Sequence, residues 1–169
     1  VAVIDTGVYV GHEAYLPRRA SVPGAVFHRA ARTRQDYYDV PDNPDDYAGH
    51  GTFVGGMIFS QGAAVAPARK GVAHGLDKLY NLKAGYAVYP SGGSSLLSDL
   101  LEAVDWALAQ PDPPEVFNYS YGARVLTGDD SYTRFWDGVV DTFGTTATIS
   151  AGNSGPADGT VGSPAIAYN

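Results

Sequence analysis

Short apolar runs that alternate with helical segments constrain the fold of this 169-residue chain most strongly. Strand-like runs occur at residues 1–4, 22–27, 79–84, 116–121 and 146–150. Helical patterns occur at residues 52–60, 96–109 and 132–143. Alternating strands and helices build parallel sheets with helices packed against them. The sequence therefore predicts an α/β fold, a doubly wound parallel sheet with helices on both faces.

Local signals refine this prediction. Gly55 and Gly56 weaken the first helix intrinsically, so we expect close packing to be the reason for them. In the second helix, leucine and valine recur every three or four positions, and Ser95 or Ser98 is expected to cap its start. Segments rich in glycine, proline, serine or aspartate are expected to form loops, at residues 36–48 and 90–95.

The composition is that of one globular domain spanning residues 1–169. Hydrophobic residues make up 44% of the chain and charged residues 17%. The net charge is −7 and no basic run occurs, which argues against a nucleic-acid partner. No apolar run approaches the roughly 20 residues of a membrane span. The absence of cysteine excludes disulfides and thiolate metal sites.

Three polar residues stand beside strand or helix ends. Asp5 ends the first strand in Asp-Thr-Gly, His50 begins a helix in Gly-His-Gly-Thr-Phe-Val-Gly-Gly, and Asn153 follows the last strand in Ala-Gly-Asn-Ser-Gly. An acid can orient an imidazole, the imidazole can accept a proton, and an amide N–H can stabilise an oxyanion. Taken singly, each has a structural explanation: a loop cap, a surface histidine and a turn asparagine. Together they favour a nucleophilic hydrolase.

These three segments resemble those of the subtilisin-like serine proteases, and the resemblance covers nearly the whole chain. It implies peptide-bond hydrolysis through an Asp-His-Ser triad, in which Asp5 orients His50, His50 is the general base and Asn153 donates to the oxyanion. Residues 160–169 resemble the family's Ser-Pro-Ala segment. The family's Gly-Thr-Ser segment does not occur in these residues. We therefore expect a sheet that is incomplete at its C-terminal end, a chain that is inactive alone, and a remaining C-terminal part that supplies the serine.

Two further segments resemble the family's substrate-binding walls. One follows the strand at residues 116–119, beside the family's first specificity pocket, and consists of Ser120, Tyr121 and Gly122. The other would pair with an extended peptide by strand addition, a flexible linker being the alternative. It consists of Gly92, Gly93, Ser94 and Ser95.

The resemblance also implies a polypeptide substrate, secretion, no required cofactor, and calcium as an optional structural ion, although no signal peptide is recognisable here. The acidic loop matches no calcium-ligand pattern, so we expect it to be solvated and assign no metal ligands. Its carboxylates are Asp36, Asp39, Asp42, Asp45 and Asp46. One alternative is a catalytically dead subtilase-like domain that binds peptides. Another is an unrelated doubly wound domain with a ligand near Asp5, but the chain has no glycine-rich phosphate loop after its first strand.

Overall fold

The computed structural model describes residues 1–27, 42–63, 66–87, 93–124 and 128–168. The chain forms two compact units, Val1–Pro113 and Pro114–Asn169, and each is considered by itself. The single catalytic domain expected over residues 1–169 stays a prediction.

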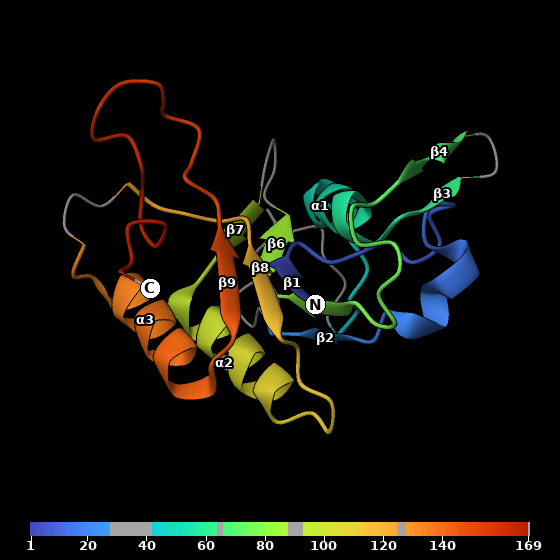
Figure 1. Cartoon of the computed structure of the whole chain (residues 1–169), viewed down its shortest axis with the longest axis horizontal. Coiled ribbons are helices and arrows are strands. Elements are labelled where there is room, and N and C mark those ends of the chain that lie inside the picture. The colour runs from blue at the N-terminus through green and yellow to red at the C-terminus, as the bar shows by residue number, and fades with distance from the viewer. Residues whose placement is uncertain (28–41, 64–65, 88–92, 125–127, 169) are drawn as a thin grey trace. The chain divides into compact units, whose positions relative to one another are not determined.

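The first unit contains a parallel sheet with the strand order β2-β5-β1 (Figure 1). Its strands are β1 (Ala2–Asp5), β2 (Gly24–Val26) and β5 (Tyr80–Lys83). Its helical elements are η1 (Leu16–Ser21), a short 3₁₀ segment, α1 (His50–Phe59) and α2 (Leu97–Leu108). Each of these strands and both α-helices fall within about two residues of their predicted positions.

Helices α1 and α2 cover opposite faces of the strand pair β1–β5. Val3 of β1 packs in a buried cluster with Phe59 of α1. The opposite face carries Tyr80 of β5, whose ring lies 6.2 Å from that of Trp106 in α2. Because side chains alternate along a strand, Asp5 shares the face of Val3 and is directed toward α1. The predicted sheet with helices on both faces is thus confirmed in this unit.

Two antiparallel hairpins complete the first unit and were not predicted. One pairs β3 (Gln61–Ala63) with β4 (Ala66–Lys70), and the other pairs β6 (Gly85–Ala87) with β7 (Gly93–Ser95). The expectation of a loop throughout residues 90–95 is therefore wrong for β7. Glycine and serine have low strand propensity, but backbone pairing with β6 overrides it.

Two expectations about helices need correction. The N-cap of α2 is Leu96, without a side-chain cap hydrogen bond; Ser98 donates instead to Asp99, and Ser95 belongs to β7. Close packing explains Gly55, where an added Cβ would lie 2.7 Å from the Tyr15 hydroxyl. It does not explain Gly56, whose nearest neighbour would be 3.6 Å away.

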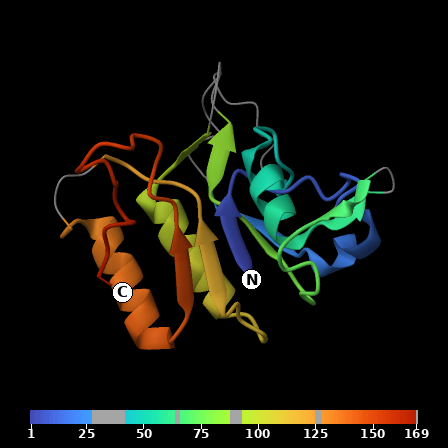
Figure 2. The ribbon, with the colours of Figure 1, turned by 45° about the horizontal axis from the view of Figure 1, so that its top comes forward.

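The second unit pairs two parallel strands and packs a helix against them (Figure 2). These elements are β8 (Val116–Tyr119), β9 (Thr146–Ile149) and α3 (Ser131–Phe143). Trp136 of α3 is buried against the rings of Phe117 and Tyr119. Asp130 caps α3 by accepting the Tyr132 and Thr133 amides, so the helix starts where its first free N–H groups find a carboxylate.

Candidate active site

Asp5 and His50 are in direct contact. The Nδ1 atom of His50 lies 2.8 Å from one Asp5 carboxylate oxygen and 3.0 Å from the other. Asp5 is buried, whereas the His50 side chain is 52% exposed. The end of β1 therefore holds the acid inside the protein, while the first residue of α1 keeps one side of the imidazole open to solvent.

Gly51 allows this close approach of strand and helix. A Cβ at this position would lie 2.1 Å from the backbone oxygen of Gly7 and 3.1 Å from the Asp5 carboxylate. Any other residue would therefore displace the helix from the acid. The glycine after His50 thus meets a specific steric requirement.

The environment of Asp5 favours a fixed imidazole orientation. Burial raises the pKa of Asp5 above its ordinary value, while hydrogen bonds from His50 and from the Thr6 amide oppose the rise. An ionised carboxylate can only accept, so the proton of the neutral imidazole must sit on Nδ1. That tautomer leaves Nε2 as the basic atom, which is the arrangement that a general base needs.

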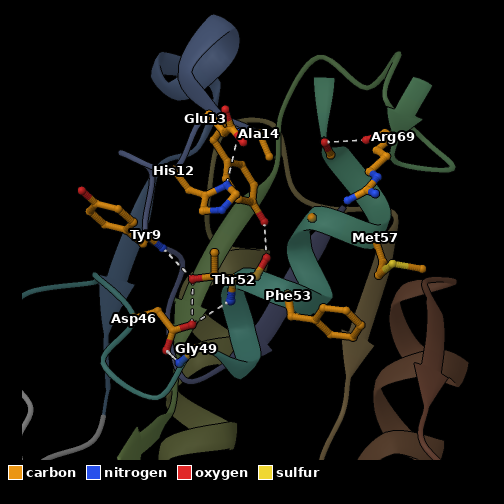
Figure 3. Close-up of a pocket in the computed structure, with 13 residues that line it drawn as sticks. Tyr9, His12, Glu13, Ala14, Asp46, Gly49, Thr52, Phe53, Met57 and Arg69 are labelled. Atoms are coloured by element: carbon orange, nitrogen blue, oxygen red, sulfur yellow. Dashed lines mark hydrogen bonds between the residues drawn. The ribbon is translucent and has the colours of Figure 1, made fainter. Parts of the chain in front are cut away.

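Asp46 is part of the same hydrogen-bond network and was missed by the sequence analysis, which placed it in a solvated acidic loop. Figure 3 shows it against the start of α1. One of its oxygens accepts from the Thr6 hydroxyl at 2.9 Å and from the amides of Ala48 and Gly49 at 2.9 and 2.8 Å. The other accepts from the Thr52 amide and hydroxyl at 2.8 and 2.7 Å.

Thr6 joins Asp46 to the Asp5–His50 pair. Its hydroxyl donates to Asp46, accepts from the Gly51 amide at 3.0 Å and lies 3.3 Å from an Asp5 oxygen. The available signal was an aspartate four positions before a residue that begins a helix, since carboxylates favour helix N-termini.

A pocket of about 610 Å³ lies beside α1 (Figure 3). Phe53 and Met57, one helical turn apart, are 67% and 58% exposed and contribute to its apolar lining. Tyr9 faces it from the segment after β1, and Asp46 borders it. The sequence analysis predicted no pocket here.

In the second unit, one pocket brings together residues predicted for two separate roles. Asn153 lines a cavity of about 260 Å³ with Ser120, Tyr121 and Gly122. Ser120 and Tyr121 lie just after β8, which ends at Tyr119. Asn153 is exposed. Its proposed alignment with His50 stays a prediction, as do the roles of these residues.

The second predicted substrate wall is only partly described. Gly93 and Ser94 lie in β7, where Ser94 pairs with Tyr86 of β6. Gly92 lies outside the described residues. Their peptide-binding role is therefore untested.

The acidic loop is only partly described, so calcium as an optional structural ion stays a prediction. The Asp46 carboxylate already accepts five hydrogen bonds, and Asp36 and Asp39 fall outside the described residues. Among the residues that are described, no three His, Cys, Asp or Glu side chains gather as a metal cluster. In the same part of the chain, no helix has the length and apolarity needed to span a membrane.

Known proteins similar to this chain are extracellular and other serine proteases. Serine protease AprX of Bacillus subtilis is 28% identical, with 98% of this chain and 35% of that protein aligned. The minor extracellular protease Vpr of the same organism is 30% identical, covering 97% of this chain and 19% of its own length. Alkaline serine exoprotease A of Vibrio alginolyticus is 32% identical over 90% of this chain and 23% of its own.

A solved structure agrees with these sequence relationships. The S41 psychrophilic protease is 25% identical, with a TM-score of 0.57 over 97% of this chain and 48% of that chain. The chain thus spans about a third or less of these curated relatives and about half of the structural one. The subtilase family model matches residues 1–169. Because that match includes every residue, the protein belongs to the subtilase family.

Proposed function

We propose that this chain forms part of the catalytic domain of a serine endopeptidase that cleaves peptide bonds through an acyl-enzyme. The observation that carries the proposal is the contact between His50 Nδ1 and the buried Asp5 carboxylate at 2.8 and 3.0 Å. Such a pair supplies the acid and base of a triad, and family membership supports serine chemistry. The serine comes from polypeptide outside these 169 residues.

In the first step, His50 Nε2 takes the serine hydroxyl proton as the serine oxygen attacks the substrate carbonyl carbon. Asp5 then faces an imidazolium and stabilises it through the Nδ1–H hydrogen bond. The proton passes from Nε2 to the leaving amine when the peptide C–N bond breaks. In the second half of the reaction, Nε2 takes a proton from water as the water oxygen attacks the ester carbonyl carbon. The proton then passes to the serine oxygen as the ester C–O bond breaks, which releases the acid product and restores the serine.

Asn153 and the two substrate walls complete the proposal. The Asn153 amide donates to the oxyanion that forms at the substrate carbonyl. Its shared cavity with Ser120, Tyr121 and Gly122 supports a role in holding the side chain next to the cleaved bond. Strand β7 offers backbone groups to an extended peptide, as strand addition requires.

The substrate is a polypeptide, and secretion of the protein is proposed from its resemblance to extracellular proteases. Phe53 and Met57 on α1 are large, exposed apolar side chains, and such side chains mark surfaces that contact further polypeptide, which supports the continuation of the domain. Signal-peptide cleavage and recovery of the protein from culture medium would test secretion.

The test of the activity uses the natural protein that contains this chain. Hydrolysis of a peptide p-nitroanilide is measured for the parent, for His50→Ala and for His12→Ala. His12 accepts the Ala14 amide through Nδ1 and serves as a matched histidine control. We expect His50→Ala to lose nearly all turnover and labelling by a fluorophosphonate, while His12→Ala keeps both. A parent that binds peptides tightly but neither hydrolyses them nor reacts would instead establish the non-catalytic alternative.

A further inference from the structure

Asp46 accepts short hydrogen bonds from groups that neighbour both members of the Asp5–His50 pair. The Thr6 hydroxyl donates to it at 2.9 Å and lies 3.3 Å from Asp5 on its other side. The amides of Ala48, Gly49 and Thr52 donate to it at 2.8–2.9 Å. One carboxylate therefore fixes the loop before α1, the first turn of α1 and the hydroxyl beside the acid.

These contacts use the full acceptor capacity of an ionised carboxylate. Its two oxygens offer about four lone-pair sites, and five donors converge on them. Hydrogen bonds to a charged acceptor are about twice as strong as neutral ones. An amide in place of this carboxylate would turn a donor toward the Thr52 N–H or toward the three donors on the other oxygen.

We propose that Asp46 is a positioning residue for the Asp5–His50 pair, acting on Asp5 through the Thr6 hydroxyl and on His50 through the start of α1. This inference rests on the proposed function, because it assigns a role within the same acid–base pair. Asp46 does not contact the reacting atoms, and its effect is on the orientation and electrostatics of the groups that do.

The charge of Asp46 also acts on the pair. It adds to the burial that raises the pKa of Asp5. Removing the charge therefore lowers the pKa of Asp5. Other charged or titratable groups near the site stay in place during this change: Lys83 beside Asp5 in β5, Asp45, Tyr15, and, around the pocket that Asp46 borders, His12, Glu13 and Arg69.

The main test compares kcat, KM and melting temperature for Asp46→Asn and Thr52→Val in the natural protein. Thr52→Val removes one Asp46 contact and the acceptor of the Tyr9 amide, but leaves the Thr6 link intact. For Asp46→Asn we expect kcat to fall about ten- to thirtyfold with KM changed less than about threefold. For Thr52→Val we expect a comparable loss in melting temperature but a much smaller loss in kcat.

Thr6 variants provide the second arm, which stands even if Asp46→Asn fails to fold. Thr6→Val removes the bridging hydroxyl and should lower kcat about tenfold, whereas Thr6→Ser keeps the hydroxyl and should recover most of that loss. Equal kcat losses in Thr6→Val and Thr6→Ser would overturn the inference. The inference would also be overturned if Asp46→Asn and Thr52→Val lowered the melting temperature equally and also lowered kcat equally.

The outcomes separate this inference from the proposed function. If Asp5→Asn in the same assay keeps full turnover, the proposed function fails. If Asp5→Asn is inactive while Asp46→Asn and Thr6→Val match the parent, only the inference fails. In a protein without peptidase activity, the NMR signal of the His50 Nδ1 proton decides the positioning role. Faster solvent exchange of that proton in Asp46→Asn, but not in Thr52→Val, supports it, and equal exchange rates overturn it.

Discussion

Replacing Asp5 by asparagine removes a charge that touches the imidazole at 2.8 and 3.0 Å while leaving the side-chain shape almost unchanged. With the charge centres about 4 Å apart and an effective dielectric constant of about 20, the attraction to an imidazolium is about 4 kcal/mol. That free energy corresponds to about a thousandfold in rate. Solvent at the half-exposed His50 reduces the effect, whereas the wrong imidazole tautomer increases it, so we expect kcat to fall between about 10² and 10⁴.

The stability of Asp5→Asn should not fall with its activity. The folded-state pKa of Asp5 is raised above the unfolded value, mainly by burial. The stabilisation that this group gives when protonated is therefore complete below the unfolded pKa and is lost as pH rises through the folded pKa. At pH 8 the buried ionised carboxylate opposes folding, so asparagine should leave the melting temperature equal or higher.

The assay compares parent, Asp5→Asn and Asp45→Asn with one peptide p-nitroanilide at pH 8, together with thermal unfolding. Asp45 lies in the same acidic loop, and its backbone, not its carboxylate, makes the contacts with Asn43 and Lys83. The control variant should therefore keep kcat within about threefold. A folded Asp5→Asn protein whose kcat stays within about tenfold of the parent would refute the assignment of Asp5 as the acid that orients His50.

Further predictions concern the second unit and the strand–helix contact. Asn153→Ala should lower kcat by about 10²–10³ with little change in KM, the magnitude known for this donor in subtilisin; an effect on KM alone would contradict the oxyanion role. Asp130→Ala should lower the free energy of unfolding by about 1–2 kcal/mol, because it removes the cap of α3, and Asp129→Ala, which loses only a surface ion pair, should lower it less. Burial raises the pKa of Asp130, but its hydrogen bonds lower that pKa by more, so the folded-state pKa lies below the unfolded value. The difference in unfolding free energy between parent and Asp130→Ala should therefore be complete above the unfolded pKa and vanish as pH falls through the folded pKa, as acid-unfolding curves would show. Gly51→Ala should lower the melting temperature and kcat together, with a stability loss of about 1–3 kcal/mol or more, because its Cβ would lie 2.1 Å from a backbone oxygen.

Strands β1 and β5 of the first unit could be predicted because their burial is continuous, and α2 because its buried residues recur at helical spacing. All four residues of β1 and all four of β5 are buried, so each strand appears in the sequence as an apolar or mixed run of the right length. The pair Asp5 and His50 could also be predicted, since each stands at the end of an element where side chains meet. Family resemblance added the role of each residue.

Other parts depended on contacts between segments distant in sequence. Strand β7 contains glycine and serine, and only its pairing with Tyr86 and its neighbours makes it a strand. The start of α2 has no side-chain cap, although two serines stand nearby. Such features depend on tertiary pairing, which overrides local propensity and leaves no trace in composition.

The carboxylates Asp5 and Asp46 show why residue type alone does not determine a role. Asp46 accepts five hydrogen bonds, which engage both of its carboxylate oxygens. Asp5 is more deeply buried, accepts from one amide and one imidazole, and lies 3.3 Å from the Thr6 hydroxyl. With few neutral donors to offset burial, its charge is stabilised most when the imidazole becomes a cation. The number of neutral donors around each carboxylate thus makes Asp46 a fixed support and leaves Asp5 able to respond to protonation of His50.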